Sequence, residues 1–201
     1  MDDIVKQAMT KWPNVPHCYG WLALDARGNW RMRDEDAQQR DLLGDKIAHV
    51  ALLAFINRNY THDEQGRWYF QNGPQRVYVD LEATPYIAHT DPVHGLVLHD
   101  GLVLDAIDQV WMTGSGQLLL QREQRIAQVD DRDVLQCMGL LMIDGTPVGD
   151  EQLMAWIARE PDAGQLVFQY AGSRIPVQHL ESDAIPAHFH FVRKPQPDGD
   201  V

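Results

Sequence analysis

The fold is decided by one stretch of sequence, Arg67-Trp-Tyr-Phe-Gln-Asn-Gly-Pro-Gln-Arg-Val-Tyr-Val-Asp-Leu-Glu82. A two-residue turn requires positive φ values, which the Asn72-Gly73 pair can adopt, so the stretch is predicted to form a β-hairpin. With this turn, Trp68 lies opposite Val77. Side chains alternate between the faces of a hairpin, so one face is apolar and is expected to be core: Trp68, Phe70, Val77, Val79 and Leu81.

The opposite face of this hairpin combines tyrosine with arginine, and it is the first place where function is expected. Tyr69 is predicted to lie directly across from Arg76. Aromatic rings can stack on a planar group, and guanidinium groups bind carboxylates or phosphates through paired hydrogen bonds. The face could therefore hold a small anionic molecule or part of a protein partner.

A second hairpin is predicted over residues 19–33, around the turn Asp25-Ala-Arg-Gly28, in which Gly28 takes the left-handed position. Leu24 then pairs with Trp30. The turn recurs as Asp63-Glu-Gln-Gly-Arg-Trp68, 38 residues further on. The repeat indicates either a duplication or two hairpins that share a common turn type.

The reverse face of this second hairpin is also aromatic and basic. If the two hairpins share a surface, seven side chains form one candidate ligand-binding site: Trp21, Arg31, Arg33, Arg67, Tyr69, Arg76 and Tyr78. The alternative is a solvated sheet face on which arginines lie over tyrosine rings and pair with Asp80 and Glu82. The pattern favours this alternative, because long charged side chains commonly cover exposed strands in this way.

Composition bounds the partners and the compartment. The chain has 201 residues, 44% of them hydrophobic and 23% charged, as in ordinary folded proteins. A formal net charge of −12 makes nucleic acid or an anionic membrane an improbable partner. The acidic N-terminus and the short apolar runs predict neither an export signal nor a membrane span. Cys18 and Cys137 lack the spacing of a metal or redox motif, so a cytoplasmic location with reduced thiols and no cofactor is expected.

Charge and proline divide the chain near residue 90. Residues 1–90 carry ten basic and twelve acidic side chains, whereas residues 91–201 carry seven and seventeen. The residue before Pro92 is also pushed out of the helical region. The expected fold class is α+β, with two small sheet-and-helix units of mainly antiparallel strands and a tail: residues 1–90, the mostly-β residues 91–192, and the mobile residues 193–201.

Apolar periodicity predicts the remaining elements. Helices are expected over residues 2–12, 45–57 and 150–160, and the second is apolar almost all round and therefore buried. Residues 134–143 are interpreted as a strand, although a helix fits the run nearly as well. Further short strands are expected, the seventh of them at an edge because it contains Pro176: residues 96–98, 102–107, 110–113, 117–122, 125–129, 166–170, 174–180 and 188–192.

The chain resembles a proteobacterial family of uncharacterised proteins in four segments: Tyr19-Gly-Trp-Leu-Ala-Leu-Asp25, Gly28-Asn-Trp30, Arg67-Trp-Tyr-Phe-Gln-Asn-Gly-Pro-Gln-Arg76 and Leu81-Glu-Ala-Thr-Pro-Tyr86. It is also similar, more distantly, to a second family of unknown function. That resemblance implies a duplicated α+β core, a C-terminal half like a pleckstrin-homology fold, and a ligand site near the interface between the halves. It implies no established reaction and brings no catalytic residues.

Two histidines near the C-terminus are the weak candidates for metal ligands. On a strand, His188 and His190 would point the same way and could share a metal with Asp183 or His179. Phe189 would then be buried, and the histidines would face water with no need to bind anything. Two histidines alone are a weak zinc signal, so no metal is predicted.

The favoured function is a non-enzymatic ligand- or protein-binding module with a regulatory or sensory role and its site at the junction of the two halves. The competing hypothesis is a hydrolase-type or metal-dependent enzyme that uses histidines and carboxylates of the C-terminal half, such as His94, His99 and Asp100. The sequence contains neither a G-x-S-x-G motif nor a phosphate-binding loop, so no catalytic residue is predicted.

Overall fold

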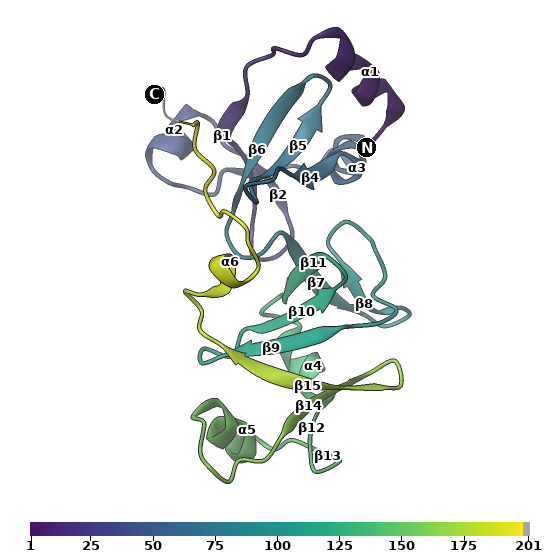
Figure 1. Ribbon diagram of the computed structural model, residues 1–201, viewed down its shortest axis with the longest axis vertical. Coiled ribbons are helices and arrows are strands. Elements are labelled where there is room, and N and C mark those ends of the chain that lie inside the picture. Colours follow the sequence, from purple (N-terminus) through teal and green to yellow (C-terminus); the bar gives the residue numbers. More distant parts are fainter. Residues whose placement is uncertain (199–201) are drawn as a thin grey trace. The chain divides into compact units, whose positions relative to one another are not determined.

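The computed structural model describes residues 1–198, which form a mixed α+β fold with two sheets of mainly antiparallel strands and few helices (Figure 1). The chain forms two compact units. The first contains Met1–Pro85 and the segment that begins at His190, and the second contains Tyr86–Phe189. The second unit begins before residue 91, because β7 (Tyr86–Asp91) pairs with strands of that unit.

The first unit is built on a six-stranded sheet with the strand order β3-β2-β1-β6-β5-β4. Two antiparallel hairpins are joined at its centre by the parallel pair of β1 and β6. Its elements are α1 (Asp3–Lys11), β1 (Cys18–Leu24), β2 (Trp30–Met32), α2 (Glu35–Gln39), β3 (Asp45–Lys46), α3 (Val50–Arg58), β4 (Tyr60–His62), β5 (Trp68–Asn72) and β6 (Gln75–Leu81).

The hairpin of β5 and β6 forms as predicted, but its turn lies one residue later. Asn72 pairs with Gln75, so the loop consists of Gly73 and Pro74. Gly73 has a positive φ of 57°, and the ring of Pro74 restricts φ at the next position to negative values. A glycine at the first central position is what a type II′ turn requires, and this turn matches the twist of the flanking strands.

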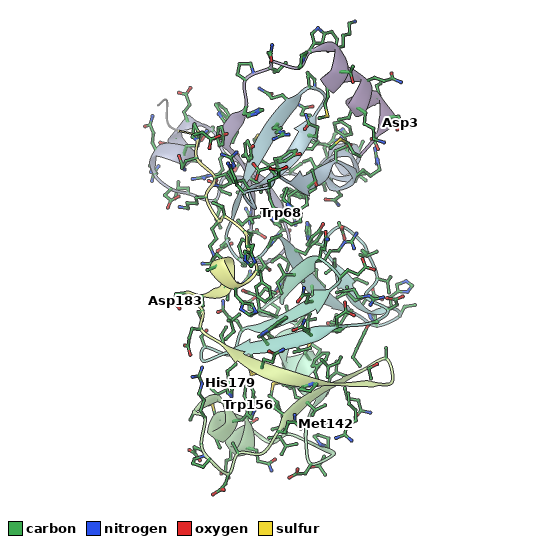
Figure 2. All side chains as sticks on the ribbon, in the orientation of Figure 1. Asp3, Trp68, Met142, Trp156, His179 and Asp183 are labelled. Atoms are coloured by element: carbon green, nitrogen blue, oxygen red, sulfur yellow. The ribbon has the colours of Figure 1, made fainter. Side chains whose placement is uncertain are left out.

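The later turn changes the pairs but not the faces. Two predicted pairs are wrong, because Val77 lies opposite Phe70 and Tyr78 lies opposite Tyr69. Each partner is displaced by two residues, so every side chain keeps its predicted face. The apolar face is core, as the buried Trp68 illustrates (Figure 2). Four of its five side chains are buried, and the fifth, Val77, is half-buried.

The hairpin of β1 and β2 has the predicted register, with Leu24 opposite Trp30. Its turn and the recurring turn before β5 have the same geometry. In both, the Oδ1 atom of the aspartate accepts hydrogen bonds from the backbone N–H groups two and four residues later. The glycines of the two turns, Gly28 and Gly66, both have a φ of 74°. The repeated sequence therefore specifies the same local structure twice.

The helix predicted over residues 45–57 is shorter and more exposed than its sequence indicates. It begins at Val50, and Nδ1 of His49 accepts a hydrogen bond from the N–H of Leu52, which satisfies one of the free donors of its first turn. The prediction of burial on all sides is wrong. Val50 is 78% exposed, whereas Ile56 is 1% exposed, so α3 buries a single stripe.

The second unit is built on a nine-stranded sheet with the order β13-β12-β14-β15-β9-β10-β11-β7-β8, in which β11 and β7, and β15 and β9, run parallel. Residues 102–107 contribute one isolated bridge in place of the expected strand. The other elements are β8 (Gly95–Leu98), β9 (Gln109–Thr113), β10 (Leu118–Arg122), β11 (Arg125–Val129), α4 (Val134–Met138), β12 (Leu141–Ile143), β13 (Thr146–Pro147), α5 (Asp150–Ile157), β14 (Leu166–Tyr170), β15 (Ser173–Leu180) and α6 (Ile185–His188).

Three predictions in this part of the chain are wrong. Residues 134–143 form α4 and then β12, with Gly139 at the end of the helix. Residues 188–192 form no strand: His188 ends α6, which has a proline in its first turn, and the left-handed φ of 55° at His190 interrupts an extended backbone. β15 is not an edge strand, since it lies between β14 and β9. Its pairing with β9 begins at Val177, so Pro176 is not required to donate a hydrogen bond to β9.

No helix within residues 1–198 is long and apolar enough to cross a lipid bilayer. Both cysteines are free thiols. Cys137 is completely buried, and this burial raises the pKa of its thiol to about 11. Cys137 is therefore a packed core residue with low reactivity, because the thiolate is the reactive form.

Candidate functional site

The polar face of the six-stranded sheet carries most of the predicted site residues. The strand registers place Arg31 of β2 and Asp80 of β6 on the same face, one strand to either side of β1. Arg76 and Tyr78 follow on this face of β6, because side chains alternate along a strand. Tyr69 of β5 lies opposite Tyr78. The two hairpins therefore share one sheet face.

Aromatic rings gather around Tyr78, which is 1% exposed. The ring of Tyr19 stacks on it, with centroids 4.6 Å apart and planes 7° from parallel. Tyr69 and His17 contact the same ring edge-on, at centroid distances of 5.6 Å and 5.7 Å. We call these residues and the charged side chains beside them the tyrosine–arginine cluster: His17, Tyr19, Asp63, Arg67, Tyr69, Arg76 and Tyr78.

Arg67 is held over the Tyr78 ring by two carboxylates. Its Cζ atom is 5.1 Å from the ring centroid. Its Nε donates a 2.8 Å hydrogen bond to Oδ2 of Asp63, which also accepts from the hydroxyl of Tyr78 at 3.1 Å. Its Nη1 donates to Oδ1 of Asp198 at 2.7 Å. Burial lowers the pKa of Arg67, but these hydrogen bonds outweigh burial and raise it overall.

Arg76 is the cation of the cluster that has no carboxylate partner within residues 1–198. Arg76 is half-buried, and its guanidinium lies over the ring of Tyr69, with Cζ 4.6 Å from the centroid. Both side chains line a cavity of about 400 Å³, together with His62, Asp63, Glu64, Gln65 and Arg67. The cavity wall therefore includes a guanidinium that lies over an aromatic ring.

The protonation states of the cluster side chains leave hydrogen-bond donors facing a bound anion. Burial lowers the pKa of His17, and the charges of Arg76 and Arg67 lower it further, so the imidazole is neutral at pH 7. Burial raises the pKa of Tyr19 and of Tyr69, so both phenols stay protonated. An anion at the cluster would meet guanidinium groups and protonated hydroxyl groups, all of which can donate hydrogen bonds.

The structure does not bring the three predicted residues of the other hairpin into this cluster. Arg31 donates a 2.8 Å hydrogen bond from Nε to Asp25 in its own turn. Arg33 is buried and forms an ion pair with Asp80, and burial raises the pKa of that aspartate in spite of the ion pair. Trp21 is 40% exposed. Arg31 lies on β2, which β1 separates from β6 and β5, and Trp21 lies on β1 itself, whose pairing with β6 shifts register between Cys18 and Leu22.

The C-terminal segment lies along the first unit and reaches the cluster. The N–H of Val192 donates a 3.0 Å hydrogen bond to the carbonyl of Gly66. Further along, the carboxylate of Asp198 contacts Arg67. A mobile tail is predicted over residues 193–201. In the described part of this segment, Lys194 forms an ion pair with Asp41, and Asp198 forms one with Arg67.

The sequence does not predict four residues at this site: His17, Tyr19, Asp63 and Asp198. Tyr19 lies in the part of β1 where the pairing with β6 shifts register, next to Gly20, whose φ is 77°. The signal for Asp63 is its position four residues before an arginine, within a turn that it also caps. Asp198 gives no local signal, because it lies 131 residues from its partner in the chain.

The predicted histidine pair does not form. His188 is the last residue of α6, and His190 has a left-handed φ of 55°, so no strand points the two rings the same way. His179 stacks instead on Trp156, with centroids 3.7 Å apart and planes 14° from parallel (Figure 2). Within residues 1–198, the side chains that could together hold a metal ion are a different group: His89, Asp130 and Asp133.

Comparisons with known proteins place the chain in a family. The DUF2944 family model, described as a protein of unknown function (DUF2946), matches residues 1–196, so the chain belongs to this family. The prediction of an uncharacterised family is thereby confirmed. A search of curated proteins found no match.

Two solved structures of DUF1285 family proteins are similar to the chain. The protein from Silicibacter pomeroyi DSS-3 has 13% sequence identity and a TM-score of 0.47, over 89% of this chain and 96% of that chain. The protein from Shewanella baltica OS155 has 11% identity and a TM-score of 0.36, over 56% of this chain and 85% of that chain. These distant similarities assign no activity, and the pleckstrin-homology likeness stays a prediction.

Proposed function

We propose that the chain is a non-enzymatic binding module whose tyrosine–arginine cluster holds a small anionic molecule. The observation that carries this proposal is Arg76, a half-buried residue that lacks a carboxylate partner within residues 1–198 and lines a cavity of about 400 Å³ together with Tyr69. A charge that is partly removed from water is stabilised by a counter-ion. A bound anion would supply that counter-ion.

The chemistry around the cavity favours a planar carboxylate as the ligand. Guanidinium groups bind carboxylates through two parallel hydrogen bonds, and aromatic rings contact planar groups favourably. The contact between Asp198 and Arg67 supports this choice, because a carboxylate of the chain itself already fits against the cluster. The cavity volume is within the range of small-molecule sites.

The residue types in the cluster support binding rather than catalysis. It contains no serine, threonine or cysteine, and the pKa of its histidine is lowered by burial and by two neighbouring arginines. The carboxylate of Asp63 is occupied by Arg67 and Tyr78. A site that binds an anion without converting it fits a regulatory or sensory role, which we place in the cytoplasm.

Isothermal titration calorimetry with benzoate and with uncharged benzamide tests the proposal. Benzoate is expected to bind and benzamide is not, because the two differ mainly in charge. Arg76→Gln is expected to weaken benzoate binding about tenfold or more, the effect of losing a charged hydrogen bond. Arg40→Gln is the matched control, since Arg40 forms an exposed ion pair with Asp36 on α2. Equal benzoate binding by the native protein and Arg76→Gln would contradict the proposed site.

A further inference from the structure

We infer that the second unit contains a binding site for a divalent metal ion of the zinc type, formed by His89, Asp130 and Asp133. The inference does not depend on the anion site proposed for the first unit. β7 and β11 run parallel and pair Ala88 with Val129. His89 follows Ala88, and Asp130 follows Val129. Because the strands are parallel, His89 and Asp130 lie beside each other. Asp133 follows in a turn closed by a 2.9 Å hydrogen bond from its N–H to the carbonyl of Asp130.

The distances between the three side chains fit a shared ion. Nδ1 of His89 is 3.4 Å from Oδ2 of Asp130 and 3.3 Å from Oδ2 of Asp133, and all three atoms lie within 4.8 Å of one another. These lengths exceed those of good N–H···O hydrogen bonds, and one ring nitrogen faces two oxygens. Ligand atoms bound tetrahedrally to zinc at about 2.0–2.2 Å are roughly 3.3–3.5 Å apart. The two distances from Nδ1 of His89 match that geometry.

The burial of Asp130 explains why a cation belongs at this position. Its side chain is 0% exposed, and a buried carboxylate requires a positive partner. Arg132 supplies one: its Nη2 donates a 2.5 Å hydrogen bond to Oδ2 of Asp130, and its Nε donates a 3.0 Å hydrogen bond to Oδ1. The Arg132 side chain is 59% exposed, so it can move into water when a metal ion takes its place.

The ligand set selects the class of metal. An imidazole nitrogen with two carboxylates suits zinc and its neighbours among the transition metals, whereas calcium takes six to eight oxygen ligands. Three protein ligands also leave a fourth position for water. His89 is about one-quarter exposed and Asp133 about one-fifth, so the site is open to solvent on one side. A metal ion can therefore enter without unfolding of the unit.

Calorimetric titration of the metal-free full-length protein with Zn²⁺ tests the inference. One ion is expected to bind per chain. His89→Ala is expected to weaken binding at least tenfold, since even the loss of an outer partner of a ligand costs about 10–100-fold. His94→Ala, which removes an exposed histidine in the loop between β7 and β8, is the matched control and is expected to bind like the native protein.

Two further measurements separate this site from adventitious binding. Arg132→Gln removes the competing guanidinium and is expected to tighten Zn²⁺ binding, which loss of a structural contact alone would not do. Co²⁺ bound in place of Zn²⁺ is expected to give the intense visible absorption of tetrahedral cobalt, and Asp133→Asn is expected to lose it. No Zn²⁺ binding by the native protein, or equal binding by native protein and a folded His89→Ala variant, would overturn the inference.

Discussion

Nε of Arg67 donates a 2.8 Å hydrogen bond to the carboxylate of Asp63, and the two side chains are only 13% and 10% exposed. The same oxygen of Asp63 accepts from the hydroxyl of Tyr78. Its other oxygen closes the turn before β5 through the backbone N–H groups of Gln65 and Arg67. A single carboxylate thus connects the recurring turn with the tyrosine–arginine cluster and fixes the arginine over the ring.

Replacement of Asp63 by asparagine is expected to lower the free energy of unfolding by about 1–3 kcal/mol, the cost of leaving a largely buried polar partner unsatisfied. The amide cannot balance the charge of Arg67. Urea denaturation measures the change. Asp36→Asn is the control, because its ion pair with Arg40 is exposed and such pairs contribute about 0.2–1 kcal/mol. Equal losses in the two variants would show that the buried pair has no special role.

The same carboxylate makes stability depend on pH. Burial raises the pKa of Asp63, but hydrogen bonds from Arg67 and Tyr78 outweigh burial and lower the pKa overall. A lowered folded-state pKa gives stability that is fully present above the unfolded pKa of about 3.9 and is lost as the pH falls through the folded-state value. Urea unfolding between neutral pH and about pH 3 is expected to show this loss. Asp63→Asn is expected to flatten it, and an unchanged slope would be the opposite result.

Replacement of Gly66 by alanine is expected to release the C-terminal segment. A Cβ atom at Gly66 would lie 2.1 Å from the carbonyl oxygen of His190, so the two backbones could not stay in place. Gly73→Ala is the matched control: it also has a positive φ, but its nearest neighbour is Cβ of Ala8 at 4.0 Å. Hydrogen exchange at the N–H of Val192 measures the contact, and exchange is expected to increase in the Gly66 variant alone. Equal protection in both variants would count against this attachment.

Asp198 forms an ion pair with the guanidinium group of Arg67, which is one of the groups that would bind the proposed ligand. Asp198→Asn is therefore expected to raise the affinity for benzoate by up to about fivefold, which corresponds to the 0.2–1 kcal/mol of an exposed ion pair. The side chain is 75% exposed, so stability is expected to change little. Titration calorimetry compares the variant with the native protein. Weaker benzoate binding by the variant would show that Asp198 belongs to the site rather than competes for it.

The hairpins could be predicted because their turns need conformations that few residues adopt. Gly28 fixed the pairing of Leu24 with Trp30, and the structure has that pair. The position of the β5–β6 turn was harder to predict, because Asn72-Gly73 and Gly73-Pro74 can each form a two-residue loop. The restricted φ of Pro74 decides between them. Helix limits such as the start of α3 depend on one capping side chain, and apolar periodicity does not show this.

The candidate site could be predicted only where it is local in sequence. Arg67, Tyr69, Arg76 and Tyr78 come from one hairpin, so period-two alternation places them on one face. Tyr19 and the C-terminal carboxylate reach the cluster through the parallel pairing of β1 with β6 and through the return of the chain to the first unit. Sequence patterns do not encode such distant pairings. The ion pair of Arg33 with Asp80 also joins distant segments, whereas Arg31 pairs with Asp25 of its own turn.

Native mass spectrometry of the protein purified from its own host cells without chelators tests the central claim most directly. The tyrosine–arginine cluster is expected to retain a small organic anion, seen as a mass excess over the bare chain. The excess is expected to persist in Arg40→Gln and to be lost in Arg76→Gln. A native protein with the mass of the bare chain, or an organic excess that Arg76→Gln keeps, would contradict the claim that the cluster is an anion-binding site.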